Sequence, residues 1–185
     1  MKKSSKTVIT TIITIAILAA LTAVLDTFAV IGFPSGVLGV SSFYIGSAFF
    51  LLFVYLFKWK GAIAIYIGLM MSSLISSGFS FFPLYGAWGN VVSAVFIVLI
   101  MHLTKRNCEI KNWKDFAVLA CTFIIAPAIS AAWVIGGWVV VGIMPADGFI
   151  AAFIPWALGG IIVYFVVGTP VMKFLAPLVK RFNIS

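Results

Sequence analysis

The sequence predicts an all-α fold: an integral membrane bundle of six transmembrane helices with both termini in the cytoplasm. Two observations lead to this prediction. Of the 185 residues, 64% are hydrophobic and 9% are charged, which is outside the range of soluble domains. Six apolar segments divide the chain, and all 12 Lys and Arg residues fall at every second boundary between them. Because short loops rich in Lys and Arg stay cytoplasmic, three loops should lie outside.

We expect one membrane domain over residues 1–185. Its spans are predicted at about 7–25, 37–57, 61–78, 87–104, 116–141 and 149–172. Each span must be helical, because within hydrocarbon a helix satisfies its backbone hydrogen bonds internally. The basic residues flank the spans at four places: Lys2, Lys3 and Lys6; Lys58 and Lys60; Lys105, Arg106, Lys111 and Lys114; Lys173, Lys180 and Arg181.

The first span follows three lysines, as a signal peptide would, but its 19 residues predict a retained transmembrane helix. Ala16, Ala19, Ala20 and Ala23 follow the spacing i, i+3, i+4 and i+7. They therefore form one stripe of small side chains along which another helix can approach closely. The partner in that contact is either another helix of this chain or a different protein.

The boundaries between the later spans differ in whether they contain basic residues. A short turn with Lys58 and Lys60 separates the second span from the third. The boundaries at 26–36, 79–86 and 142–148 contain no basic residue and carry Gly and Pro, and the first two also contain aromatic residues. We expect these outer loops to fold back over the helix ends as lids.

Several function classes are disfavoured. The positive charges are dispersed over membrane-flanking sites, where anionic lipid accounts for them, which argues against a nucleic-acid partner. Glu109 and Asp115 are expected to be solvated loop charges, and no carboxylate lies deep in a span. A lone His102 cannot form a His-rich metal site. Without a nucleophile motif, a zinc helix or a phosphate-binding loop, we expect neither an enzyme nor a cofactor or metal.

Aromatic, amide and small side chains gather at the outer level of the spans. Candidate substrate-binding residues are Asp26, Tyr85, Trp88, Asn90, Ser130, Trp133, Gly137 and Trp156. For the aromatic residues the alternative is an interfacial belt. For Asn90 it is a helix-capping or interhelical amide, and for Asp26 a hydrated helix-end charge.

Together these features resemble the substrate-binding (S) component of energy-coupling factor (ECF) vitamin transporters. The resemblance rests on the Ala16/Ala20 and Ala19/Ala23 pairs, the Phe57–Gly61 turn, the Pro83 loop before Gly89-Asn90, and the Pro155–Gly160 segment. It extends over nearly the whole chain in length, span number and orientation.

The resemblance implies the substrate-capture subunit of an ECF-type ABC transporter in a prokaryotic cytoplasmic membrane. Such a subunit takes up a micronutrient and docks on a membrane coupling subunit that carries two cytoplasmic ATPases. It also implies that the four alanines of the first span form the docking surface. The alternative function is a membrane sensor or scaffold module that transports nothing.

The charge of the predicted outer face limits the substrate. No Lys or Arg lies there, and its ionisable side chains are Asp26 and Asp147. Because a buried anion would need a cationic partner or a dense set of backbone donors, we expect a neutral or cationic, heterocyclic vitamin or precursor. Its ring would stack on Trp133 or Trp88, where a cation would also gain from the aromatic face.

Overall fold

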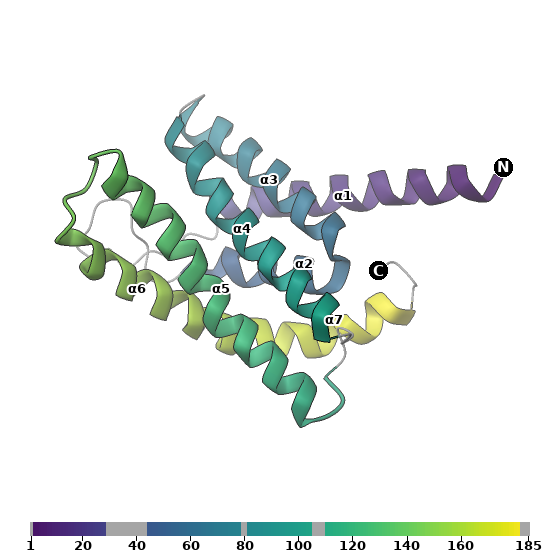
Figure 1. Cartoon of the computed structure of the whole chain (residues 1–185). Helices are drawn as coiled ribbons and strands as arrows, with labels where there is room; N and C mark the ends of the chain where they lie inside the picture. Colours follow the sequence, from purple (N-terminus) through teal and green to yellow (C-terminus); the bar gives the residue numbers. More distant parts are fainter. Residues whose placement is uncertain (1, 29–43, 79–80, 105–109, 182–185) are drawn as a thin grey trace.

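The computed structural model describes residues 2–28, 44–78, 81–104 and 110–181. Within these ranges the secondary structure is entirely helical (Figure 1). The elements are α1 (Lys2–Phe28), α2 (Ile45–Phe57), α3 (Trp59–Ser77), α4 (Phe81–Thr104), α5 (Trp113–Val140), α6 (Gly148–Val163), the π-helical turn η1 (Tyr164–Gly168) and α7 (Thr169–Arg181). The last three follow one another without a break. The predicted all-α fold of six apolar segments is therefore confirmed for the described ranges.

The helices extend beyond several predicted spans. The fourth begins at Phe81 rather than at 87, and the sixth continues through α7 to Arg181 rather than ending at 172. Hydropathy locates the apolar part of a helix, whereas the helix itself continues into the polar flanks. The predicted residues 37–43 of the second span lie outside the described residues.

Four helical segments are long and apolar enough to cross a membrane: Thr7–Phe28, Tyr85–Thr104, Trp113–Val140 and Gly148–Val179. Two shorter apolar helices accompany them, Ile45–Phe57 and Trp59–Ile75. At 1.5 Å per residue, the 13 residues of α2 extend about 20 Å, less than the roughly 30 Å of bilayer hydrocarbon. These lengths and compositions are those of a membrane protein.

Helix α2 is the centre of the bundle. Its seven residues from Phe50 to Leu56 are all buried, so the helix is enclosed on every side. It packs against α3, α4 and η1, while α4 packs on α5 and α5 on α6. A helix that is apolar all round is suited to this enclosed position. Figure 1 shows α2 in the middle, with the first half of α1 reaching out on the right.

The first helix packs mainly on α3, at a close crossing. A Cβ atom on Gly68 of α3 would lie 2.5 Å from both the carbonyl oxygen of Ala19 and Cβ of Thr22. The bare Cα of Gly68 therefore permits this approach. Apolar side chains of α1 that stay exposed include Ile12, Ile13, Ile17, Leu21 and Val24.

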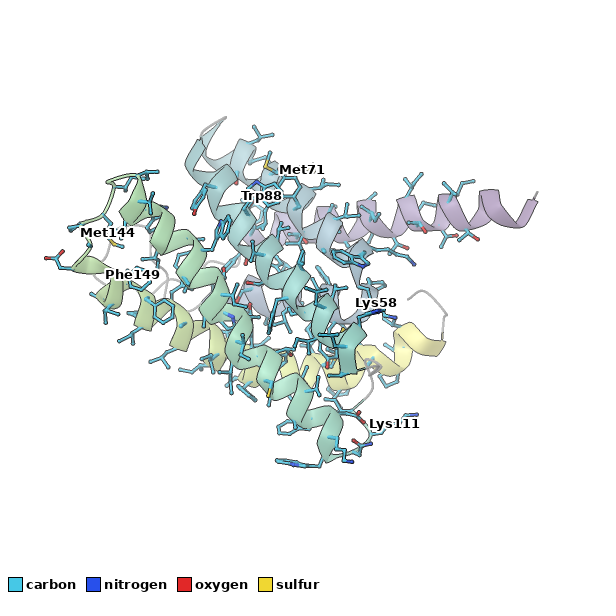
Figure 2. The ribbon with its side chains drawn as sticks, viewed as in Figure 1. Lys58, Met71, Trp88, Lys111, Met144 and Phe149 are labelled. Atoms are coloured by element: carbon cyan, nitrogen blue, oxygen red, sulfur yellow. The ribbon has the colours of Figure 1, made fainter. Side chains whose placement is uncertain are left out.

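Basic residues and the α5–α6 turn lie toward opposite ends of the molecule. Figure 2 shows Lys58 and Lys111 toward the right-hand side and Met144 and Phe149 at the far left. This separation agrees with basic loops at one membrane face and the 142–148 loop at the other. Which face is cytoplasmic stays a prediction from the charge pattern.

Asp115 differs from its prediction. It is only 9% exposed and forms a capping box at the start of α5, so the expectation of a solvated loop charge was wrong. Its backbone N–H donates to Asn112 Oδ1 at 3.0 Å, and its Oδ2 accepts from the Asn112 N–H at 3.2 Å. The other predicted loop acid, Glu109, lies outside the described residues.

Replacing Asn112 with alanine should lower the free energy of unfolding by about 1 kcal/mol, because the helix loses its side-chain cap. For a domain of this size that corresponds to a fall in Tm of roughly 2–4 °C. Thermal unfolding of the detergent-solubilised protein measures it, and Asn112→Ser, which keeps a capping oxygen, is the control. An unchanged Tm would show that the capping box contributes nothing to the stability of the protein.

Candidate functional site

Four predicted site residues meet between α4 and α5. The ring of Tyr85 stacks on Trp133, with 6.0 Å between centroids and 17° between planes, and its hydroxyl donates to the Trp133 carbonyl oxygen at 2.8 Å. A Cβ atom on Gly137 would overlap that hydroxyl, so the bare glycine makes room for Tyr85. Ser130, one helical turn before Trp133 on α5, lies beside Gly89 of α4. This face of α5 is therefore occupied by α4.

The two other predicted tryptophans lie on different helix pairs. Trp88 is half exposed and meets Tyr66 of α3 at 5.1 Å between ring centroids. Trp156 meets Trp138 edge to face at 6.4 Å, within a separate apolar cluster between α5 and α6. The eight predicted residues consequently do not converge on one cavity.

A polar site instead lies in the middle of the bundle. Asn90 and Ser93 of α4, Phe50 of α2 and Tyr164 of η1 border a cavity of about 10 Å³. Ser93 Oγ donates to the carbonyl oxygens of Ala126 at 2.8 Å and Gly89 at 3.0 Å, which ties α4 to α5. Among the predicted site residues, Asn90 is the one that borders this cavity.

The π-helical turn directs Tyr164 toward this cavity. Such a turn adds a residue to one helical turn and is frequent at functional sites. The Tyr164 ring is buried and packs on Phe123 of α5 at 5.7 Å between centroids. On the next turn, a Cβ on Gly168 would come within 3.2 Å of the same Phe123 ring. Phe123 therefore supports the π-helical turn from one side.

Asp26 joins the site from the end of α1. The hydroxyl of Tyr44, the residue before α2, donates to Asp26 Oδ1. Ser47 Oγ donates to the Tyr44 carbonyl oxygen at 2.7 Å and lies next to the Tyr164 side chain. We call Asp26, Tyr44, Ser47, Asn90, Ser93 and Tyr164 the central polar group. It carries a carboxylate, an amide and hydroxyls, and no cationic side chain belongs to it.

Two of these six residues, Asp26 and Asn90, were predicted from sequence. Tyr44, Ser47, Ser93 and Tyr164 were not predicted, because the aromatic residues of the outer loops are the more conspicuous feature of the sequence. A signal existed for Tyr164, a polar aromatic residue in the middle of an otherwise apolar segment. Ser93, three residues after Asn90, also falls on the same helical face as that amide. The other two had no distinguishing spacing.

The alanine stripe of α1 is divided between two faces. Ala19 and Ala23 are buried, at 3% and 7% exposure, on the side that packs against α3. Ala16 and Ala20 are exposed. Half of the predicted docking surface therefore packs within this chain, and the other half is accessible.

In the described part of the chain, no three His, Cys, Asp or Glu side chains gather in a way that could hold a metal ion. The chemistry that the central polar group offers is hydrogen bonding and attraction of positive charge. The chain matches no protein-family model, no curated protein and no solved structure.

Proposed function

We propose that this protein is the substrate-capture subunit of an ECF-type ABC transporter, which imports a small neutral or cationic, heterocyclic micronutrient. Its partners would be a membrane coupling subunit and two cytoplasmic ATPases, in a prokaryotic cytoplasmic membrane with both termini inside. The observation that carries this proposal is the central polar group, which brings hydrogen-bonding side chains from four helical segments into an apolar membrane bundle.

The chemistry of that group supports the proposed substrate class. The Asp26 carboxylate accepts a hydrogen bond from Tyr44 and is partly shielded from solvent, rather than being a freely hydrated helix end. A carboxylate in such surroundings attracts a cation or a hydrogen-bond donor. The Tyr44 and Phe50 rings lie edge to face at 5.6 Å beside it and offer apolar contact for a heterocycle.

Substrate entry would require the central cavity to widen. Its volume of about 10 Å³ holds at most one water molecule, whereas ligand sites have roughly 300–1,000 Å³. We propose that α2, α4 and η1 separate around Asn90 and Tyr164 to admit the substrate. The outer loops at 26–36 and 79–86, which we expect to fold over the helix ends, would act as gates, and of these loops residues 29–36 and 79–80 lie outside the described residues.

The small cavity also favours the alternative function, a sensor or scaffold that transports nothing. Co-purification distinguishes the two. A transport subunit expressed at native level should bring down a membrane coupling protein and ATPase subunits, whereas a sensor should bring down a signalling partner or nothing.

Equilibrium binding of a vitamin panel to the purified protein is the direct test of the proposal. The panel should include flavin, pyridoxine, thiamine and their precursors as neutral or cationic members, and folate and phosphorylated vitamins as anionic ones. We expect sub-micromolar binding of a member of the first set. No binding across the panel would contradict substrate capture, and tight binding of a dianion would contradict the charge argument.

For a cationic substrate, replacing Asp26 with asparagine should weaken binding by about tenfold, because it removes the one negative charge of the central polar group. A neutral analogue of the same ring should bind with little change. Isothermal titration of both ligands measures the difference. Asp147→Asn is the matched control, since Asp147 is exposed at the start of α6. Equal losses for both ligands would assign Asp26 a structural role.

A further inference from the structure

The α5–α6 hairpin is divided between two separate apolar clusters. In α5, Ala126 belongs to the main cluster around α2, whereas Ala131 belongs to a second cluster that α5, α6 and their connecting turn form among themselves. Further along the chain, Ala157 belongs to the second cluster and Val163 again to the main one. Residues 128–159, which we call the distal hairpin, therefore have a core of their own. In Figure 1 they extend beyond α2 on the left.

The two points of division lie against each other. A Cβ atom on Gly160 of α6 would come within 2.7 Å of the Cβ atom of Pro127 in α5, so the bare glycine permits this contact. Pro127 has no N–H group and cannot donate to the carbonyl oxygen of Phe123, four residues back. Prolines are the usual sites of helix bending, and the adjacent Gly159 and Gly160 weaken α6 at the same level. Both helices are thus easiest to bend where they touch.

On the α4 side, Tyr85 contacts the distal hairpin. Its hydroxyl donates to the carbonyl oxygen of Trp133 at 2.8 Å, and the two rings stack. Gly137 makes room for that hydroxyl, and Gly89 of α4 makes room for Val134. This contact consists of one aromatic pair and close backbone approaches at two glycines, so it can separate without disturbing either apolar cluster.

The buried contact with α4 also carries a polar group that is not satisfied. Ser130 Oγ is buried beside Gly89 and has no hydrogen-bond partner among the described residues. On the other side of the division, by contrast, Ser93 Oγ donates to the carbonyl oxygens of both Ala126 and Gly89. Burial of a hydroxyl without a partner is costly, and access of water to Ser130 would remove that cost. The α4–α5 contact is therefore less stable beyond Pro127 than before it.

We propose that the distal hairpin pivots at Pro127 and Gly160. It moves between the closed arrangement of this structure and an open one in which Trp133 leaves Tyr85 and water reaches Ser130. Hinge motions of this kind need only a few residues that absorb the change. Because Asn90 follows Gly89, opening would uncover the side of α4 next to the central polar group. The pivot does not rest on the proposed transport function, whereas its use as a substrate entrance does.

Double electron–electron resonance on the full chain in lipid nanodiscs, without substrate, tests the pivot. Two pairs of spin labels join the same two helices, in a background with Cys108→Ser and Cys121→Ser. The first pair is Ile75→Cys with Val140→Cys, and the second is Trp59→Cys with Trp113→Cys, all at exposed positions. We expect two distances for the first pair, because Val140 ends α5 in the distal hairpin, and one distance for the second.

Two substitutions should shift the ratio of open to closed molecules in opposite directions. Tyr85→Phe removes the hydroxyl that bonds Trp133 and should raise the ratio about threefold to tenfold. Ser130→Ala removes the unsatisfied hydroxyl and should lower the ratio about fivefold or more. The control is Tyr66→Phe, which removes a hydroxyl from α3, where the ring of Tyr66 meets Trp88 of α4. It should leave the ratio unchanged.

A third substitution tests the position of the pivot. Pro127→Ala restores the backbone N–H and keeps the Cβ atom that meets Gly160, so it should reduce the Ile75–Val140 pair to one distance. Pro155→Ala, a change of the same kind inside the distal hairpin, is the matched control and should leave both distances in place. Thermal unfolding checks that each variant is folded.

One narrow distance for the Ile75–Val140 pair in the wild type and in Tyr85→Phe would overturn the pivot. Equal broadening of both label pairs would also overturn it, because the motion would then not begin at Pro127. If Tyr85→Phe does not fold, Ser130→Ala and Pro127→Ala decide the outcome, and two unchanged distances in both would contradict the proposal. Two distances in a protein that binds no vitamin would keep the pivot and contradict the transport function alone.

Discussion

Replacing Gly61 with alanine should prevent the protein from folding, at a cost of more than about 3 kcal/mol. A Cβ atom at this position would lie 2.8 Å from the backbone nitrogen of Val54 and closer still to the carbonyl group of Phe53. These are main-chain atoms of the central helix, so no side-chain rotation can relieve the overlap. Lys58, with φ of 53°, sets the sharp turn between α2 and α3 that brings the backbones together.

The yield of monodisperse protein and its thermal unfolding measure this effect. Gly86→Ala in α4 is the matched control, because a Cβ there meets nothing within 4 Å and alanine favours a helix interior by roughly 0.5–1 kcal/mol. We expect Gly86→Ala to be neutral or stabilising. A folded Gly61→Ala protein with a wild-type Tm would mean that α2 and α3 do not approach each other this closely.

Replacing Ala16 and Ala20 together by leucine should leave substrate binding intact and reduce uptake by more than about tenfold, the equivalent of 1.4 kcal/mol. Both alanines are exposed on α1, so larger side chains disturb no contact within this chain. In the proposed transporter they would hold the coupling subunit away from the helix, since small residues are what permit close helix approach. Uptake into cells and binding by the purified protein provide the two measurements.

The structure supplies a control from the same stripe. Ala19→Leu and Ala23→Leu place bulk in the buried contact with α3, so this pair should lower Tm and protein yield instead. Unchanged uptake in a well-expressed Ala16/Ala20 variant would contradict the docking role of the exposed half. A destabilised Ala16/Ala20 variant would show that this half also packs within the chain.

The sequence by itself determined the number of apolar helices, their approximate positions and the boundaries that carry the positive charge. It could do so because hydrocarbon leaves a spanning segment only the helical conformation, so hydropathy is enough to locate it. The helix ends were less well predicted. Asn112 and Asp115 begin α5 ahead of the apolar segment, and such a cap is a local hydrogen-bonding feature that hydropathy does not detect.

Only the tertiary structure decided which faces meet. The spacing of the alanines defined a stripe on α1, but the crossing at Gly68 determined that Ala19 and Ala23 are buried while Ala16 and Ala20 are not. Helical periodicity specifies which residues share a face and does not specify the neighbour of that face.

In the candidate site, too, the sequence identified some of the residues, and the tertiary structure decided which of them meet. Tyr85 and Trp133 were predicted to line a cavity, and the structure places them against each other between α4 and α5. Tyr44 and Tyr164 were not predicted, because one lies at the end of a helix whose neighbours were unknown and the other is oriented by a π-helical turn. That turn adds a residue and so rotates every later side chain relative to a regular helix. Its contacts with Phe123 of α5, through the Tyr164 ring and at Gly168, correspond to no pattern along the segment.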